Sequence, residues 1–182
     1  PKRVGGVVRV MGAYSGTLTV QCALKLAPLV FVRPGGLRSA LWEDIDLEKA
    51  DWRYTVTKTD TDHIVPLSRQ AIEILETLHP MTGRWEFVFP SARSRRRPMS
   101  NNAVLSAMRR MEIDKDEMSG HGFRAMARTI LDEVLGYRVD IIEHQLAHRV
   151  KDPLGRAYNR TSHLVERKEM MQAWADYLES LR

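Results

Sequence analysis

His121-Gly122-Phe123-Arg124 opens a run that continues through His144-Gln145-Leu146-Ala147-His148 to Ala157-Tyr158-Asn159-Arg160. The apolar spacing between these motifs predicts helices from about residue 122 to 135 and from about 139 to 147, and a short helix around Tyr158. A guanidinium matches the oxygens of an anion such as phosphate, an imidazole moves a proton near neutral pH, and an activated phenol oxygen can form an ester. The three groups together predict a reaction at an anionic centre.

The rest of the chain changes its hydrophobic period twice. Three short runs rich in β-branched and aromatic residues predict strands at Ile45, 53–57 and 63–67, with a turn at 59–62. Helical patterns lie on both sides of them, and the last helix is expected from about Ser162. We therefore expect an α+β fold that is mainly α-helical, with one small three-stranded antiparallel sheet.

Two expectations concern the first third of the chain. Gly5-Gly6 and the lack of a clear period predict a loose lead-in over residues 1–14. A helix is expected to start at residues 15–17 and run toward Val32, and Pro28 should kink or divide it because proline lacks the N–H that a helix interior uses.

Length and composition set the broad class of protein. The chain has 182 residues, of which 43% are hydrophobic, so it can build the core of a single domain over residues 1–182. Its 28 Lys and Arg against 23 Asp and Glu give a formal charge of +5, which favours a polyanionic partner. Cys22 is the single cysteine, so no internal disulfide is possible. No apolar run is long enough to cross a membrane, so no membrane partner is expected.

Six residues in order along the chain resemble the active-site set of the tyrosine recombinases, or phage integrases: Arg38, Lys58, His121, Arg124, His148 and Tyr158. Arg38 ends the motif Pro34-Gly35-Gly36-Leu37-Arg38, and Lys58 lies in the predicted hairpin, as the family's lysine does. The segments 63–68 and 174–178 are similar to the prophage-integrase branch. Each motif alone is weak, but six in order across sheet and helices form a specific match to nearly the whole chain.

The resemblance implies the tyrosine recombinase catalytic-domain fold and a role for each residue. Arg38 and Arg124 would hold the non-bridging oxygens of a DNA phosphate, and His148 would donate a hydrogen bond to it. Tyr158 would attack the phosphorus, with His121 acting on protons and Lys58 supplying a proton to the leaving 5′ oxygen. The 3′-phosphotyrosyl product keeps the bond energy for rejoining, so no cofactor is expected.

The resemblance also implies partners and a place of action. It implies a double-stranded DNA attachment site, a homotetramer on DNA, and action in the bacterial cytoplasm at the nucleoid. The chain begins at Pro1, so we expect it to be the catalytic part of a longer protein whose N-terminal DNA-binding domains precede it. The helix within 162–182 is expected to dock either on a neighbouring copy or on its own core.

A basic loop and an unusual neighbour of Arg38 bear on activity. The loop carries four arginines that could follow a DNA backbone or could simply be solvated: Arg93, Arg95, Arg96 and Arg97. Many family members carry an acidic residue three positions after the first arginine, where this chain has Leu41. A less rigid Arg38 and lower activity are therefore expected.

Two other functions remain open from the residues alone. His144 and His148 are spaced as zinc ligands on one helix face, although Gln145 replaces the glutamate of the zincin motif, and four turn aspartates could form a two-metal nuclease set: Asp44, Asp46, Asp60 and Asp62. A catalytically weak or inactive DNA-binding module is the second alternative. Taken singly, each of the six residues also has an ordinary structural explanation.

Overall fold

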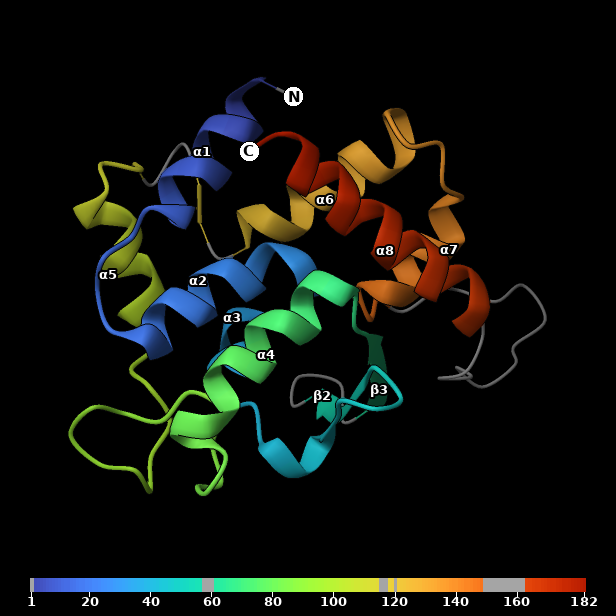
Figure 1. Ribbon diagram of the computed structural model, residues 1–182. Helices are drawn as coiled ribbons and strands as arrows, with labels where there is room; N and C mark the ends of the chain where they lie inside the picture. Colours follow the sequence, from blue (N-terminus) through green and yellow to red (C-terminus); the bar gives the residue numbers. More distant parts are fainter. Residues whose placement is uncertain (1, 57–60, 115–117, 120, 149–162) are drawn as a thin grey trace.

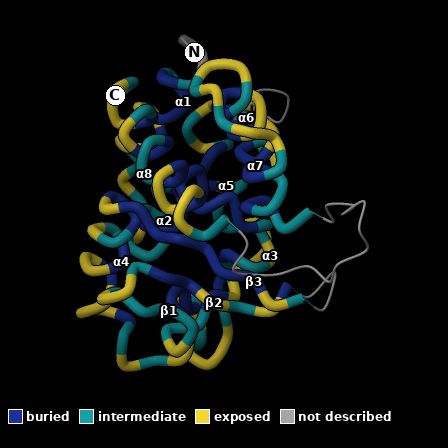
Figure 2. The backbone as a smooth tube through the Cα atoms, turned by 90° about the vertical axis from the view of Figure 1, so that its right-hand side faces the viewer, coloured by how far each residue is buried: buried dark blue, intermediate teal, exposed yellow. Residues whose placement is uncertain are grey.

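A buried helix, α2 (Leu18–Val30), runs through the middle of the molecule (Figures 1 and 2). In this computed structural model, which describes residues 2–56, 61–114, 118–119, 121–148 and 163–182, α2 is in contact with helices on all sides. They are α1 (Lys2–Gly12), α3 (Pro34–Arg38), α4 (Arg69–Thr82), α5 (Ala103–Arg110), α6 (Gly122–Glu133) and α8 (Leu164–Ser180). A helix that is apolar on most of its surface needs such cover.

Helix α2 is continuous through Pro28, so of the expected kink or division the division does not occur. The helix continues to Val30, so Pro28 lies in its last turn. The missing N–H there removes one backbone hydrogen bond near the helix end, which destabilises the helix little. The Pro28 carbonyl accepts a hydrogen bond of 2.8 Å from the indole Nε1 of Trp174 on α8. Burial of residues 26–30 and this cross-helix bond offset the cost of the proline.

The loose lead-in expected over residues 1–14 is also wrong, because most of it forms α1. Helix α1 lies beside the C-terminal end of α8 (Figures 1 and 2), where Arg9 Nη1 donates to the Leu181 carbonyl at 2.6 Å. A Cβ atom at Gly5 would lie 2.9 Å from the Leu181 oxygen. The glycine is therefore required for close helix packing rather than for a flexible loop.

The predicted sheet is confirmed as three antiparallel strands in the order β1 (Ile45–Asp46), β2 (Asp51–Val56) and β3 (Thr61–Pro66). Residues 61 and 62, which we expected in the turn, belong to β3 and pair with β2. The register places Tyr54 opposite His63. The other two turn residues, 59 and 60, and the neighbouring Lys58 lie outside the described residues.

The C-terminal helix packs on its own domain. The large apolar side chains of this helix, which was considered for contact with another copy, are buried: Met170, Met171, Trp174 and Leu178. Trp174 lies edge-to-face with Phe31 at the end of α2, with ring centroids 5.7 Å apart. None of the described helices is long and apolar enough to span a membrane.

Candidate active site

A cavity of about 740 Å³ opens between α3, strand β2 and the start of α6. Arg38, the last residue of α3, and His121, the residue before α6, both line it. Arg33 and Tyr54 line the same cavity. The fold thus brings together side chains that are 83 residues apart in the sequence and were predicted to share one site.

Arg38 is held by a backbone carbonyl rather than by a carboxylate. Its Nη1 donates to the Met99 oxygen at 2.8 Å. Leu41, where an acidic brace was expected, instead pairs its backbone with Phe87. A carbonyl fixes one arm of the fork without neutralising its charge, so the full positive charge of Arg38 stays available to an anion.

Arg124 on α6 is buried, with 8% of its surface exposed, and it is fixed by three partners. Its guanidinium donates to the carbonyls of Phe31 and Leu146, the latter at 2.6 Å, and its Nη2 lies 3.1 Å from His148 Nε2. Burial, followed by the charge of Arg33, lowers the pKa of Arg124 to about 10. Arg124 therefore remains cationic at neutral pH, but its charge is poorly compensated.

Both carbonyls that bind Arg124 come from strained segments of backbone. Phe31 has φ 59° at the C-terminal cap of α2, and Ala147, which follows Leu146, has φ 50°. A residue with a Cβ atom in the left-handed region costs about 1 kcal/mol. The chain thus maintains two unfavourable conformations next to the contacts that fix this one guanidinium.

His148 stands between Arg124 and an acidic residue that the sequence did not single out. Its Nδ1 lies 2.5 Å from Glu143 Oε2, and Glu143 also accepts from Arg128 Nε at 2.6 Å. Burial alone would raise the pKa of Glu143, but the hydrogen bonds from Arg128 and His148 outweigh it and lower that pKa. Because an ionised carboxylate only accepts and a guanidinium only donates, the neutral imidazole carries its hydrogen on Nδ1 and accepts at Nε2.

A second buried network supports the segment that carries His148. The fully buried Arg167 on α8 donates from Nε to Gln145 Oε1 at 2.9 Å and from Nη2 to the Ile64 carbonyl. His63 Nε2 lies 3.1 Å from the Gln145 carbonyl. Helix α7 (Val139–Gln145) is thereby tied to both β3 and α8, which fixes where Leu146 and His148 lie.

We expect His63 to make the stability of the domain depend on pH. His63 is 2% exposed, and burial, then the charge of Arg167, lowers its pKa from 6.5 to about 3. Between these values the unfolded chain binds a proton that the folded protein excludes, so stability is lost as the pH falls below 6.5. The loss is about 2 kcal/mol between pH 7 and pH 5.

Urea unfolding of the wild type and of His63→Gln at pH 7 and pH 5 measures this term. The variant should lose about 2 kcal/mol less than the wild type over that interval. Equal losses in the two proteins would show that His63 titrates normally in the folded state.

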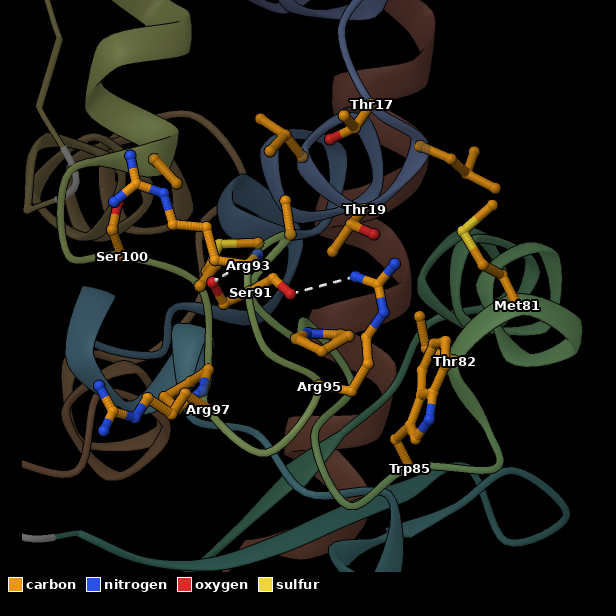
Figure 3. A pocket seen from close by; sticks show the side chains of 17 residues that line it. Thr17, Thr19, Met81, Thr82, Trp85, Ser91, Arg93, Arg95, Arg97 and Ser100 are labelled. Carbon is orange, nitrogen blue, oxygen red and sulfur yellow. Dashed lines mark hydrogen bonds between the residues drawn. The ribbon is translucent and has the colours of Figure 1, made fainter.

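The basic loop surrounds a separate cavity of about 730 Å³ (Figure 3). Arg93, Arg95 and Arg97 line it, whereas Arg96 is exposed on the same loop and is not among its lining residues. Arg95 donates to the Ser91 carbonyl at 3.1 Å and lies 4.9 Å from the centre of the Trp85 ring. Stacking on Trp85 orders a guanidinium that keeps most of its donors free.

The basic loop adjoins the cavity that holds Arg38. Arg38 also lines a small hollow together with Met99 and Ser100, and these two residues line the cavity of the basic loop as well. The basic loop therefore neighbours Arg38, and the carbonyl of Met99 joins the loop to Arg38 directly.

Two predicted site residues, Lys58 and Tyr158, lie outside the described residues. Among the described ones, no three His, Cys, Asp or Glu side chains form a group that could hold a metal ion. The ring of His144 contacts that of His163, and the second imidazole of the considered zinc pair, His148, binds Glu143.

The geometry adds residues that sequence patterns did not single out. Arg33, Glu143 and the carbonyls of Phe31 and Met99 all contact or neighbour the predicted residues. Arg33 directly precedes the Arg38 motif and Glu143 lies five residues before His148, so proximity in sequence was the available signal for these two. The guanidinium groups of Arg33 and Arg38 and the imidazole of His121 line one cavity, and such groups suit a phosphate-like anion.

Comparison with known proteins identifies the family. The chain belongs to the phage integrase family, whose model matches residues 7–163. It is 42% identical to the integrase of Enterobacteria phage P4 over 94% of its length, and 35% identical to the prophage integrase IntA of Escherichia coli K12 over 99%. It covers 43% and 44% of those two proteins, so the chain spans less than half of their length.

Solved structures agree on the fold. The integrase of mycobacterium phage Brujita superimposes with a TM-score of 0.72 at 18% identity, over 97% of this chain and 61% of that one. A lambda integrase dimer bound to a core site gives a TM-score of 0.57 at 21% identity, over 86% of this chain and 58% of the other. The expected tyrosine recombinase catalytic-domain fold is therefore confirmed.

Proposed function

We propose that residues 1–182 are the catalytic domain of a site-specific integrase that cuts and rejoins DNA. Tyr158 Oη attacks a DNA phosphorus, the new P–O bond to tyrosine forms, and the bond to the 5′ oxygen breaks. Lys58 gives the leaving oxygen its proton, and His121 accepts the proton of the phenol. The 5′ hydroxyl of a partner strand then reverses these steps and releases Tyr158.

The observation that carries this proposal is the arrangement of Arg124. A buried guanidinium with little compensation is costly, and this one is held by the carbonyl of Phe31, which has a positive φ, by the carbonyl of Leu146, and by His148. Such preorganised donors act where charge develops in a transition state, and each is typically worth about 10²–10³ in rate. Arg38 and His121, in the adjoining cavity, complete the set around the phosphate.

Arg124 and His148 are in contact in the absence of DNA: Arg124 Nη2 lies 3.1 Å from His148 Nε2. A DNA phosphate that takes the place of this contact accepts a hydrogen bond from Arg124 Nη2. His148 donates to the same phosphate as the imidazolium, whose added proton comes from solvent and whose charge Glu143 balances through Nδ1.

The partner proposed for this surface is duplex DNA. The lambda integrase with the same fold is bound to a core site, and the prophage relatives are integrases. The net charge of +5 and the arginines of the basic loop, which neighbours Arg38, suit a sugar-phosphate backbone. Assembly as a homotetramer on an attachment site, preceding DNA-binding domains, and action in the bacterial cytoplasm belong to this proposal.

The proposal is tested by trapping the intermediate. The full-length protein is incubated with a nicked duplex in which the cleaved 5′ fragment diffuses away, with excess EDTA present. We expect a covalent protein–DNA adduct at the same rate with and without EDTA. Cleavage that requires a divalent metal and leaves no adduct would instead identify a metal nuclease, and binding without cleavage would identify an inactive module.

A further inference from the structure

Arg167, in the first turn of α8, is a fully buried cation, and none of the proposed catalytic roles uses it. Replacing a buried charged group with an apolar side chain of similar volume often leaves a protein equally stable or makes it more stable. Stability alone is therefore a poor reason for a cation at this position, and the contacts of Arg167 indicate a different task.

Arg167 connects two elements that lie next to predicted site residues. Its Nη2 donates to the Ile64 carbonyl on β3, the strand that follows Lys58 in the sequence. Its Nε donates at 2.9 Å to Oε1 of Gln145, the last residue of α7. Because the N–H groups of a guanidinium lie in one plane, these two bonds fix Gln145 relative to β3 in direction as well as in distance.

Gln145 is also held through its backbone. His63 Nε2 lies 3.1 Å from the Gln145 carbonyl, and His63 donates this bond because a carbonyl only accepts. Burial, then the charge of Arg167, keeps the pKa of His63 low, so the imidazole stays neutral at physiological pH. Buried groups therefore fix both the side chain and the backbone of Gln145, which is itself 1% exposed.

The next carbonyl along the chain binds an arginine of the active site. Leu146, which follows Gln145, accepts from Arg124 Nη2 at 2.6 Å, and His148 contacts the same nitrogen. Misplacing a group at a reaction centre by about 1 Å can cost about 10²-fold in rate. Arg167 is thus one hydrogen bond and one peptide unit away from a carbonyl that orients Arg124.

We propose that Arg167 is a positioning residue for Arg124 and acts on it through Gln145. By holding Gln145 against β3, Arg167 sets the place of the Leu146 carbonyl, and that carbonyl orients Arg124 toward the DNA phosphate. This role rests on the proposed function and extends the site to a residue that does not touch DNA. Loss of Arg167 should therefore slow the reaction while DNA binding is kept.

The test compares single-turnover adduct formation at saturating DNA by the full-length wild type, Arg167→Met and Arg167→Lys on the nicked duplex. Arg167→Met should be at least about tenfold slower, and Arg167→Lys, which keeps the charge but not the two directed bonds, should recover only part of the rate. Leu178→Ala removes buried packing about 16 Å further along the same helix and serves as the control. After correction for the folded fraction from urea unfolding, it should react like the wild type.

A double-mutant cycle separates positioning from a loss of folded protein. In the Arg124→Lys background, Arg167→Met should slow the reaction by less than about threefold, because the group that it positions is already impaired. A merely structural effect would lower the rate by the same factor in both backgrounds. Gln145→Met removes the acceptor of Arg167 Nε without removing a charge, and it should slow the wild type as Arg167→Met does.

The Gln145→Met variant keeps the test decisive if Arg167→Met does not fold. A wild-type rate for either variant, or an equal defect of Arg167→Met in both Arg124 backgrounds, would overturn the assignment. Failure of the proposed function itself gives a different result, because the wild type would then form no covalent adduct.

Discussion

A Tyr158→Phe variant of the full-length protein is expected to bind DNA as the wild type does and to form no covalent adduct. The substitution removes one oxygen atom and keeps the ring, so the fold and the cationic cavity are retained. Without Oη, no other group in the proposed mechanism supplies the bond to phosphorus. Denaturing gels of reactions on the nicked duplex measure the adduct, with a gel-shift titration to confirm equal binding.

Tyr137→Phe provides the matched control for this experiment. Tyr137 lies between α6 and α7, and its backbone N–H donates to the Leu131 carbonyl, a contact that phenylalanine keeps. We expect this variant to form adduct at the wild-type rate. Persistent adduct with Tyr158→Phe would mean that a different residue is the nucleophile.

Replacing Arg124 is expected to have the second largest effect. Arg124→Lys keeps a positive charge but cannot bond the Phe31 and Leu146 carbonyls and still present a forked pair of donors to phosphate. The rate of adduct formation at saturating DNA should fall by about 10²–10³. Single-turnover measurements across DNA concentrations separate this loss from weaker binding.

Stability has to be followed in the same variant, because Arg124 is buried and joins the end of α2 to the segment after α7. Urea unfolding tells whether the variant is folded under the assay conditions. Arg128, on the exposed side of the same helix, reaches His148 only through Glu143. Arg128→Lys should therefore lower the rate of adduct formation less than about tenfold. A folded Arg124→Lys variant within threefold of wild type would contradict the role given to Arg124.

Much of the fold followed from local patterns. The β-branched and aromatic residues at 53–57 and 63–67 predicted β2 and β3, and Ser68 caps α4 with its hydroxyl as such residues do. Of the six motif residues, Arg38 and His121 line one cavity and Arg124 bonds His148. Order along the chain was sufficient for these four residues because each lies in or next to the end of a described helix.

The contacts that tune the site were not predictable in this way. The braces of Arg38 and Arg124 are backbone carbonyls of Met99 and Phe31, and any residue type offers a carbonyl. Their positions depend on how α2 and the basic loop pack, which is a tertiary property. The same holds for Pro28, whose helix is maintained by burial and by Trp174 rather than by local preference.

The central claim is that the cationic side chains of the site bind one DNA phosphate and that the phenol oxygen of Tyr158 attacks it. Peptide mapping by mass spectrometry of the adduct formed on the nicked duplex tests it most directly. We predict a single modified peptide in which the nucleotide is joined through its 3′ phosphate to Tyr158. A nucleotide attached to any other residue, or through a 5′ phosphate, would contradict the account.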